Sequence, residues 1–451
     1  MNRDTPNDRT FSGTHASARL TRLVIAGAVL GLTLEVTGGR LAAIGLLGLL
    51  FVIAEASIVA LSEPHGRDTV AWRLLAAILA VQTIGIAVDP VLQPMSPVFR
   101  MTVAMLAVIG SAILALLCVA SARHLFALFA VACVVAAMIG LCVLRELPKP
   151  GIDVVLFQQE SARALLQGLD PYAMRFSDPY PPKASAIFYG PGVSVGGVLQ
   201  FGFPYMPISL LLAIPAFLAG DIRYTSLAAM LVSAWLIARA QPSRGAYLGG
   251  TLLALSAAMP QMLYQGWIES TVVLCVAVVW FCQCRMPKLV PYATGLLFVS
   301  KQYMIIAAPV VLLLARNPRD LATLSGFGIR AGLAGAAITL PFVLRDPSAF
   351  MASAVWLQFR QPVRADALSF LVWAAPDHPL GWLWLAFVAP MIAWGVILLR
   401  NHRRPVSFPL ALALTMLLFF SLNKQAFLNY YYLVLGCLCC AIAAESKKEW
   451  I

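Results

Sequence analysis

The stretch RELPKPGIDVVLFQQESARALLQGLDPYAMRFSDPYPPK, residues 145–183, is a polar interruption in a sequence that is hydrophobic on both sides of it. It holds five basic and five acidic residues, which are too many to lie in membrane hydrocarbon and too varied for a plain linker. The hydrophobic flanks therefore decide the class of fold, and the polar stretch is where we expect any chemistry.

Composition places the chain among polytopic membrane proteins of the all-α class. The 451 residues are 61% hydrophobic and 12% charged, whereas soluble domains carry about 25% charged residues. The longest polar stretches, of about 40 residues, leave no room for a large soluble domain, so an active site must be built from loops and helix ends at the membrane surface. The net charge of +12 is spread over short loops rather than gathered on one face, and we expect no nucleic-acid partner.

Apolar segments of membrane-spanning length determine the predicted topology. Each of the segments before the polar stretch is near the ~20 residues that cross about 30 Å of hydrocarbon. They lie at roughly 20–38, 41–61, 70–88, 98–120 and 124–144. The later apolar segments fall near 187–202, 206–219, 224–239, 245–262, 264–283, 289–300, 303–315, 323–344, 381–400, 406–422 and 427–444. We therefore predict a bundle of roughly 13–16 transmembrane segments, with short amphipathic helices in two external loops, 145–185 and 345–380.

The distribution of Lys and Arg predicts the orientation. With both termini in the cytoplasm, 19 of these residues lie inside and 13 outside, and 8 of the 13 belong to the two long loops. We expect a multi-pass cell-membrane protein with its site on the extracytoplasmic side. The predicted parts are a disordered cytoplasmic tail at 1–19, an additional N-terminal transmembrane block at 20–120, a transmembrane catalytic core at 121–444 and a cytoplasmic tail at 445–451.

Asp153 is the candidate catalytic carboxylate, and it has a structural alternative. It precedes an expected helix at about 154–168, so it is placed to act either as a helix N-cap or as a general base. Three residues after it stands Leu156, so there is no capping box. Two other acidic residues have structural alternatives as well: Asp170 in a Leu-Asp-Pro-Tyr turn, and Glu160 in a helix pair with Arg163.

Cationic side chains are predicted at two further places. Lys301 falls at the turn between the segments 289–300 and 303–315, where it either binds an anion or extends to the lipid headgroups. In the second loop, Asp346 is a predicted N-cap for a surface helix that ends near Arg360. Arg360 and Arg364 either bind a ligand phosphate there or anchor the loop to lipid phosphates.

Cofactor and metal motifs are absent from the sequence. There is no Walker A motif, no dinucleotide-binding glycine motif and no His-Glu-x-x-His, and the five histidines are scattered. The spacing of Asp153, Glu160 and Asp170 matches no metal-binding motif, so we assign no metal site and predict no required cofactor. Glu35 and Glu55 lie inside predicted spans, where they either function or pair with each other or with Arg40.

Three further elements occur in a fixed order along the chain. They are Gly151-Ile-Asp153 with Ala164-Leu-Leu-Gln-Gly-Leu-Asp-Pro-Tyr172, then Ser300-Lys-Gln302 followed by Pro309, and Asn423-Lys-Gln-Ala-Phe-Leu-Asn-Tyr-Tyr-Tyr432. In a chain of this topology they resemble the GT-C superfamily of integral membrane glycosyltransferases. Within that superfamily, these elements are most similar to those of the polyprenyl-phosphate-sugar-dependent hexosyl- and mannosyltransferases of glycosyltransferase family 87 type. The resemblance covers roughly 124–444 and leaves residues 20–120 without a role.

The resemblance implies an enzyme that moves a hexose, with mannose favoured, from a polyprenyl-phosphate-linked donor to a lipid or glycan acceptor outside the cytoplasm. Its partners would be membrane lipids, the lipid-linked donor and that acceptor. Asp153 would take the acceptor's proton, and cations would stabilise the leaving phosphate. The phosphate-binding candidates are Arg360, Arg364, Lys301 and Lys183. Supporting candidates are Asp170, Glu160, Tyr189 and Lys424, and Tyr180 and Tyr189 are candidates for stacking on the sugar.

Two other classes of function remain open at this point. A transporter or lipid flippase would show inverted repeats and broken helices near the middle of the membrane, whereas here the polar residues collect in two external loops. A structural or assembly subunit would have loop charges that merely face water.

Overall fold

The computed structural model describes residues 15–62, 70–315, 320–377, 379–401 and 406–446. It is 76% helical with almost no strand, which confirms the predicted all-α class. Eight of its helices are long and apolar enough to cross a membrane, or nine if one bent pair counts as a single span, and four shorter apolar helices accompany them in the described ranges. The predicted tail at 1–19 falls mostly on residues outside these ranges.

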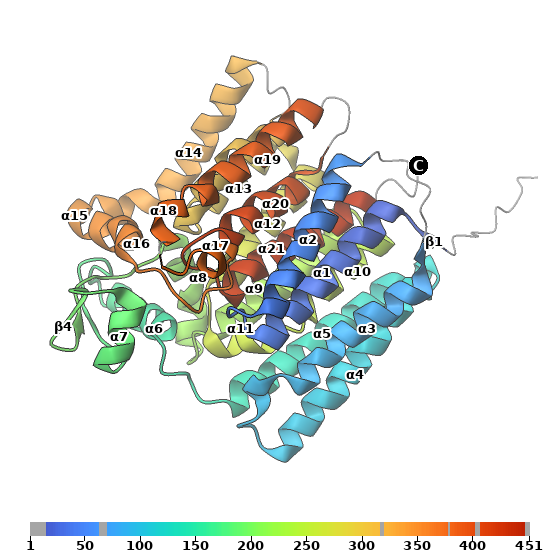
Figure 1. The fold of residues 1–451 in the computed structure, drawn as a ribbon, viewed down its shortest axis with the longest axis horizontal. Helices are drawn as coiled ribbons and strands as arrows, with labels where there is room; N and C mark the ends of the chain where they lie inside the picture. The colour runs from blue at the N-terminus through green and yellow to red at the C-terminus, as the bar shows by residue number, and fades with distance from the viewer. Residues whose placement is uncertain (1–14, 63–69, 316–319, 378, 402–405, 447–451) are drawn as a thin grey trace, which may run out of the picture.

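Five long helices precede the polar stretch, close to the five segments predicted there, and the first four of them make up the N-terminal block (Figure 1). Their bounds are α1 Ala18–Thr37, α2 Ala43–Leu61, α3 Trp72–Val88, α4 Pro97–Val119 and α5 Ala122–Glu146. The short strands β1 (His15–Ala16) and β2 (Val70–Ala71) pair antiparallel beside them. Ser17 caps the first helix by accepting a hydrogen bond from the amide of Leu20. Glu55 pairs with Arg22 at 2.9 Å, and not with Glu35 or Arg40.

A buried ion pair joins the first and last helices, and its two residues lie where the sequence predicted the tails at 1–19 and 445–451. Arg19 Nε lies 2.8 Å from Glu445 Oε2, and both side chains are buried. Because α1 begins at Ala18 and the last helix, α21, runs from Leu428 to Glu445, residues 18, 19 and 445 belong to the bundle and not to tails. The two ends of the bundle therefore lie at one face of it (Figure 1).

The remaining helices complete the bundle. They are α8 Pro207–Leu218, α9 Tyr224–Ala240, α10 Arg244–Ala254, α11 Met259–Gln265, α12 Glu269–Arg285, α13 Val290–Phe298, η3 Gln302–Leu313, α14 Leu321–Val343, α19 Leu385–Asn401 and α20 Phe408–Ser421, with the short η1 Pro90–Leu92 and η2 Pro287–Leu289 between helices. η3 is a 3-10 helix of 12 residues. At about 2.0 Å per residue it extends ~24 Å, further than the ~18 Å of an α-helix of equal length.

The predicted span at 187–202 is wrong. The chain there forms the end of α7 (Pro182–Tyr189) and then the strands β4 (Ser194–Val195) and β5 (Val198–Leu199) of a small antiparallel sheet with β3 (Phe176–Ser177). Gly196 and Gly197 at the turn between β4 and β5 have positive φ, which a helix does not allow. The apolar side chains of this stretch instead pack against α6 (Asp153–Leu166) in a second core outside the long helices.

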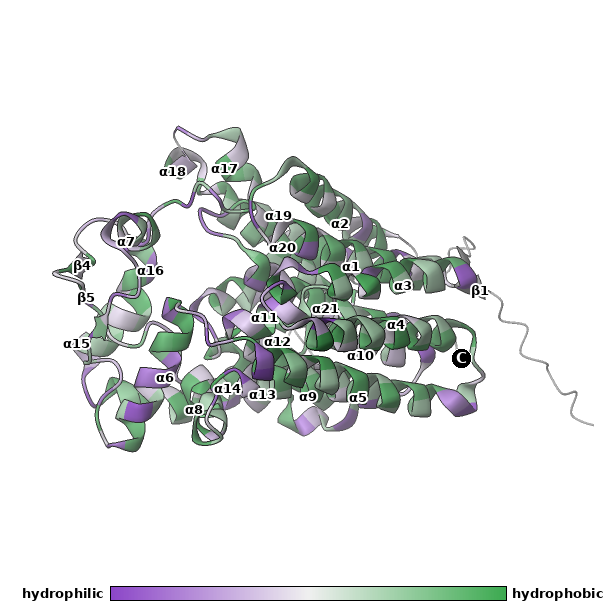
Figure 2. Cartoon of the chain, turned by 90° about the horizontal axis from the view of Figure 1, so that it is seen from below, coloured by the Kyte–Doolittle hydropathy of each residue, from purple (hydrophilic) through white to green (hydrophobic). Residues whose placement is uncertain are grey.

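The two polar loops contribute to this second core. They lie at the end of the molecule opposite β1, beyond the hydrophobic helices (Figure 2). The predicted surface helix of the second loop is confirmed as α15 (Pro347–Phe350), the π-helix η4 (Met351–Trp356) and α16 (Leu357–Arg360), followed by the short α17 (Phe370–Ala374) and α18 (Pro379–Trp382). Asp346 caps it by accepting from the amide of Ala349 at 2.9 Å. Ser353 ties the loops together, because its hydroxyl donates to Tyr172 O and accepts from Gly202 N.

Two local features fix the position of the first loop and of the cavity described below. Arg223, only 2% exposed, donates to the carbonyls of Leu144 and Leu147 at the end of α5 and pairs with Asp221. It therefore holds the chain that leads to α6. Inside the bundle, α11 and α12 are bent by 118° at the break after Gln265, where Gly266 has φ +60, so α12 begins at Glu269 within the protein.

Candidate functional site

A cavity of about 310 Å³ lies where the two loops meet the helix ends. Its charged lining consists of three cations and three carboxylates, Arg40, Lys301, Arg364, Asp153, Glu269 and Asp366. The rest is largely carboxamide and aromatic: Gln261, Gln265, Gln358, Gln361, Gln425, Asn429, Phe157, Tyr180, Phe188, Tyr189, Phe201, Tyr205, Trp267, Phe427 and Tyr430. Residues from α6, α7, the bent helix pair, the second loop and the start of α21 thus share one cavity.

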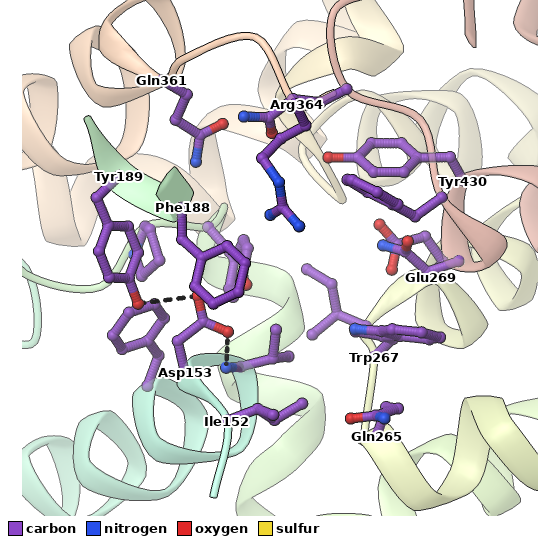
Figure 3. Close-up of a pocket in the computed structure, with 18 of the residues that line it drawn as sticks. Ile152, Asp153, Phe188, Tyr189, Gln265, Trp267, Glu269, Gln361, Arg364 and Tyr430 are labelled. Carbon is purple, nitrogen blue, oxygen red and sulfur yellow. Dashed lines mark hydrogen bonds between the residues drawn. The ribbon is translucent and has the colours of Figure 1, made fainter. Parts of the chain in front are cut away.

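Asp153 stands at the start of α6, half-buried, with both carboxylate oxygens hydrogen-bonded (Figure 3). Oδ2 accepts from the Tyr189 hydroxyl at 3.0 Å, and Oδ1 accepts from the Val154 amide at 2.8 Å. The structure places Ile152, and not Asp153, at the N-cap position of this helix. Asp153 is its first helical residue, and through Val154 it satisfies one free amide of the first turn from inside the helix rather than from the N-cap position.

The surroundings of Asp153 make it a stronger base than an ordinary aspartate. Burial raises the pKa of its carboxyl, while hydrogen bonds from Tyr189 and Tyr180 and the charge of Arg364 oppose that rise. A carboxylate with a raised pKa accepts a proton more readily, which is what a general base requires.

Arg364 reaches into the cavity between Asp153 on one side and Glu269 with Tyr430 on the other (Figure 3). Its Nε and Nη2 each lie 2.9 Å from an oxygen of Asp366 in a forked ion pair. The guanidinium stacks 4.3 Å from the centre of the Phe188 ring and 4.9 Å from that of Phe427. The ion pair and the two rings therefore fix the side chain, and its Nη1 group, which makes no hydrogen bond to any described residue, is left for a ligand.

Lys301 forms a buried ion pair with Glu269 on the other side of the cavity. Lys301 is 7% exposed and Glu269 is 0% exposed, and their Nζ and Oε1 atoms are 2.7 Å apart. The Lys301 ammonium also lies 4.7 Å from the centre of the Tyr205 ring. In the described part of the chain, Glu269 Oε2 accepts no hydrogen bond. The predicted lysine of the turn at 301 is thus paired inside the protein and does not extend to the headgroups.

Six carboxamide side chains line the cavity. Gln358 and Gln425 donate to backbone carbonyls of Pro204 and Pro362. The side-chain amides of the other four, Gln261, Gln265, Gln361 and Asn429, make no hydrogen bond to any described residue and face the cavity. Amides of this kind both donate to and accept from hydroxyl groups, and aromatic rings beside them offer flat apolar faces.

Five of the predicted site residues lie outside this cavity. Arg360 ends α16 and is exposed, as is Lys183 in the first turn of α7. Glu160 pairs with Arg163, three residues on, and Asp170 accepts from the Tyr172 amide at 2.9 Å as a turn-forming residue. The structure therefore favours the structural alternatives for both acids.

Lys424 is the fifth of these residues, and its side chain bonds to the backbone of the second loop. Its ammonium donates to the carbonyl of Gln361 at 2.6 Å, with longer contacts to Gln358 O and Phe359 O. It therefore joins the turn before α21 to the second loop.

Sequence reasoning assigned no site role to three charged residues of the cavity, Glu269, Arg40 and Asp366. Glu269 lies inside the predicted segment 264–283, and a carboxylate within an apolar segment is itself a signal for function. Arg40 lies in the short turn between α1 and α2, and no local pattern distinguishes it from the other loop arginines. The contact between this turn and the second loop, where Leu41 N donates to Asp366 O, brings it to the cavity.

The described residues contain no group of three or more His, Cys, Asp or Glu arranged to hold a metal ion. The cavity contains a carboxylate with a raised pKa, cations held in fixed positions, and carboxamide side chains that can bind hydroxyl groups. Comparison with family models, with curated proteins and with solved structures gives no match to this chain.

Proposed function

We propose that the protein is a membrane glycosyltransferase that moves a hexose from a polyprenyl-phosphate-linked donor to a lipid or glycan acceptor at the outer face of the membrane. The observation that carries the proposal is the juxtaposition in one cavity of Asp153, whose carboxyl has a raised pKa, and the fixed guanidinium of Arg364. A base and a phosphate-binding cation are the two groups that this reaction needs.

The reaction is a single displacement at the anomeric carbon. The bond between that carbon and the donor phosphate breaks, and the phosphate leaves with the bonding electrons toward Arg364 Nη1. The acceptor oxygen forms the new bond, and its proton passes to Asp153. Fixed cations that stabilise charge developing on the leaving group lower the barrier. A single displacement of this kind inverts the anomeric configuration.

The lining of the cavity suits a sugar. Four carboxamides without a hydrogen bond to any described residue can bind hydroxyl groups, and Phe188, Trp267 and Tyr430 supply apolar faces. The volume, about 310 Å³, is at the lower end of small-molecule sites. It accommodates a hexose while leaving a lipid tail outside.

Resemblance to GT-C enzymes supports the finer parts of the proposal. In that arrangement the number of membrane crossings is roughly 13–16, with the bent pair α11 and α12 and the four shorter apolar helices, η3 among them, counted as crossings beside the eight long ones. The cavity then opens outside the cell, and mannose is the favoured sugar. The shared face of the two chain ends fits an arrangement with both termini in the cytoplasm.

Asp153→Asn tests the proposal, because asparagine has nearly the same shape but cannot take up the acceptor's proton. Turnover of a radiolabelled polyprenyl-phosphate sugar with lipid extract as acceptor should fall by roughly 10²–10⁴-fold while donor binding stays near wild type. The matched control is Asp346→Asn, which also replaces a carboxylate in an external loop but retains helix capping and lies outside the cavity. Full turnover by Asp153→Asn would refute the assignment of the base.

One observation favours a second candidate, a transporter of lipid-linked sugar. The break between α11 and α12 places a buried ion pair, Glu269 with Lys301, at a helix end inside the bundle, as transporters do with their substrate sites. In sealed vesicles a transporter would move the lipid-linked sugar across the membrane with its phosphate bond intact, and Asp153→Asn would leave that movement unchanged. Release of free polyprenyl phosphate instead supports the transferase.

A further inference from the structure

Arg40 comes from the N-terminal helical block, the part of the chain to which the sequence assigns no role. The turn between α1 and α2 is joined to the second loop by backbone contacts. Leu41 N donates to Asp366 O at 2.9 Å, and Arg40 pairs with Ala367 in an isolated antiparallel bridge. These contacts fix Arg40 beside the segment that carries Arg364.

Close packing on the other side of the turn makes this position rigid. Gly39 has φ +68, and a Cβ atom at this residue would lie 2.1 Å from the backbone nitrogen of Leu428, the first residue of α21. Only glycine fits there, both in conformation and in space. The turn is thus held between the second loop and the start of the last helix, and Arg40 cannot move away without breaking both contacts.

The charges of the cavity distinguish Arg40 from its other cations. Lys301 is paired with Glu269 and Arg364 with Asp366, each at less than 3 Å. The side chain of Arg40 makes no ion pair with any described residue, although it lines the cavity and is exposed. Three cations and three carboxylates sum to zero when all are ionised. An anionic ligand therefore gains most from the one cation in this part of the structure that has no carboxylate partner.

We propose that Arg40 binds the phosphate of the lipid-linked substrate together with Nη1 of Arg364. The inference rests on the proposed function, since it is that function which brings a lipid phosphate to the cavity. Arg40 stands at the exposed edge of the cavity, where a phosphate would join a sugar inside to a lipid tail outside. Its forked guanidinium matches the oxygens of a phosphate. The N-terminal block is then part of the binding site and not an appendage to it.

The test compares two probes that differ only in the phosphate, a short-chain polyprenyl monophosphate and the corresponding polyprenol. Binding to the full-length protein in detergent micelles is followed by tryptophan fluorescence, because Trp267 lines the cavity. Wild type should bind the monophosphate more tightly than the alcohol. Arg40→Gln should weaken binding of the monophosphate by ~10-fold or more, the value of one charge-assisted contact, and leave the alcohol unaffected. Arg40→Lys should restore part of the loss.

Each outcome decides a separate question. The matched control is Arg100→Gln, which removes a half-buried arginine of α4 in the same block, away from the cavity. If Arg40→Gln keeps the full wild-type preference for the monophosphate, Arg40 is an anchor to membrane phosphates only and the inference is overturned, while the proposed function stands. If wild type itself does not distinguish the two probes, a lipid phosphate is not the ligand and both fall.

Discussion

Breaking the ion pair between Glu269 and Lys301 should cost far more stability than removing both of its members. Glu269 is fully buried and Lys301 nearly so, and the two atoms lie 2.7 Å apart. At an effective dielectric constant of ~20, the attraction across that distance is about 6 kcal/mol, which offsets the desolvation of both groups. Glu269→Gln or Lys301→Met alone leaves one buried charge without its partner and should destabilise by ~3–5 kcal/mol.

The double variant, Glu269→Gln with Lys301→Met, removes both charges and should recover most of that loss. The assay is equilibrium unfolding in mixed micelles with an increasing fraction of SDS, followed by tryptophan fluorescence for wild type, both single variants and the double variant. Single variants that each lose less than about 1 kcal/mol would show a pair of the weak, solvated kind and refute the reasoning. Turnover of the refolded double variant then shows whether Glu269 also serves the substrate, because a purely structural pair leaves turnover intact.

Three further changes have definite expected outcomes. Tyr189→Phe removes a hydrogen bond that favours ionised Asp153, so the pKa of Asp153 should rise and the acidic limb of the pH–rate profile should move to higher pH, with turnover restored as the pH increases. Gly39→Ala forces a Cβ atom against the backbone of Leu428 and should lower both the unfolding temperature and monophosphate binding, whereas Gly326→Ala, with nothing within 4 Å, should do neither. Cysteine at Ser177, exposed in β3, should react with an impermeant maleimide in intact cells, with the unmodified protein as background; labelling only after lysis contradicts an external loop.

The five long helices before the polar stretch were predictable because each is decided by local hydrophobicity. The segments predicted at 98–120 and 124–144 differ from α4 and α5 by no more than two residues at either end. The same signal failed at 187–202, where apolar residues serve a small core between loops. Hydrophobicity alone does not tell lipid-facing residues from those buried in protein, although the glycines at 190, 192, 196 and 197 indicate turns.

The candidate site was predictable only in part, for a related reason. Asp153 and Arg364 lie in the polar loops, where the sequence predicts the site, and both line the cavity. Arg360 and Arg364 look equivalent in sequence, yet only the latter is turned inward, by its pair with Asp366 and by the backbone bond from its amide to Lys424 O. The partner of Lys301 lies 32 residues away at the start of α12, and that of the turn at Arg40 more than 300 residues away. Contacts over such distances follow from the assembled fold.

The ion pair between Arg19 and Glu445 has a consequence for how the chain is made. Its members are 426 positions apart, and at 5–20 residues per second a ribosome needs roughly 20–90 s to cover that distance. For this interval the first helix has been delivered to the membrane with an arginine whose acceptor does not yet exist. Until α21 arrives, that charge is left to the Ser62 carbonyl after α2, to the insertion machinery and to lipid headgroups.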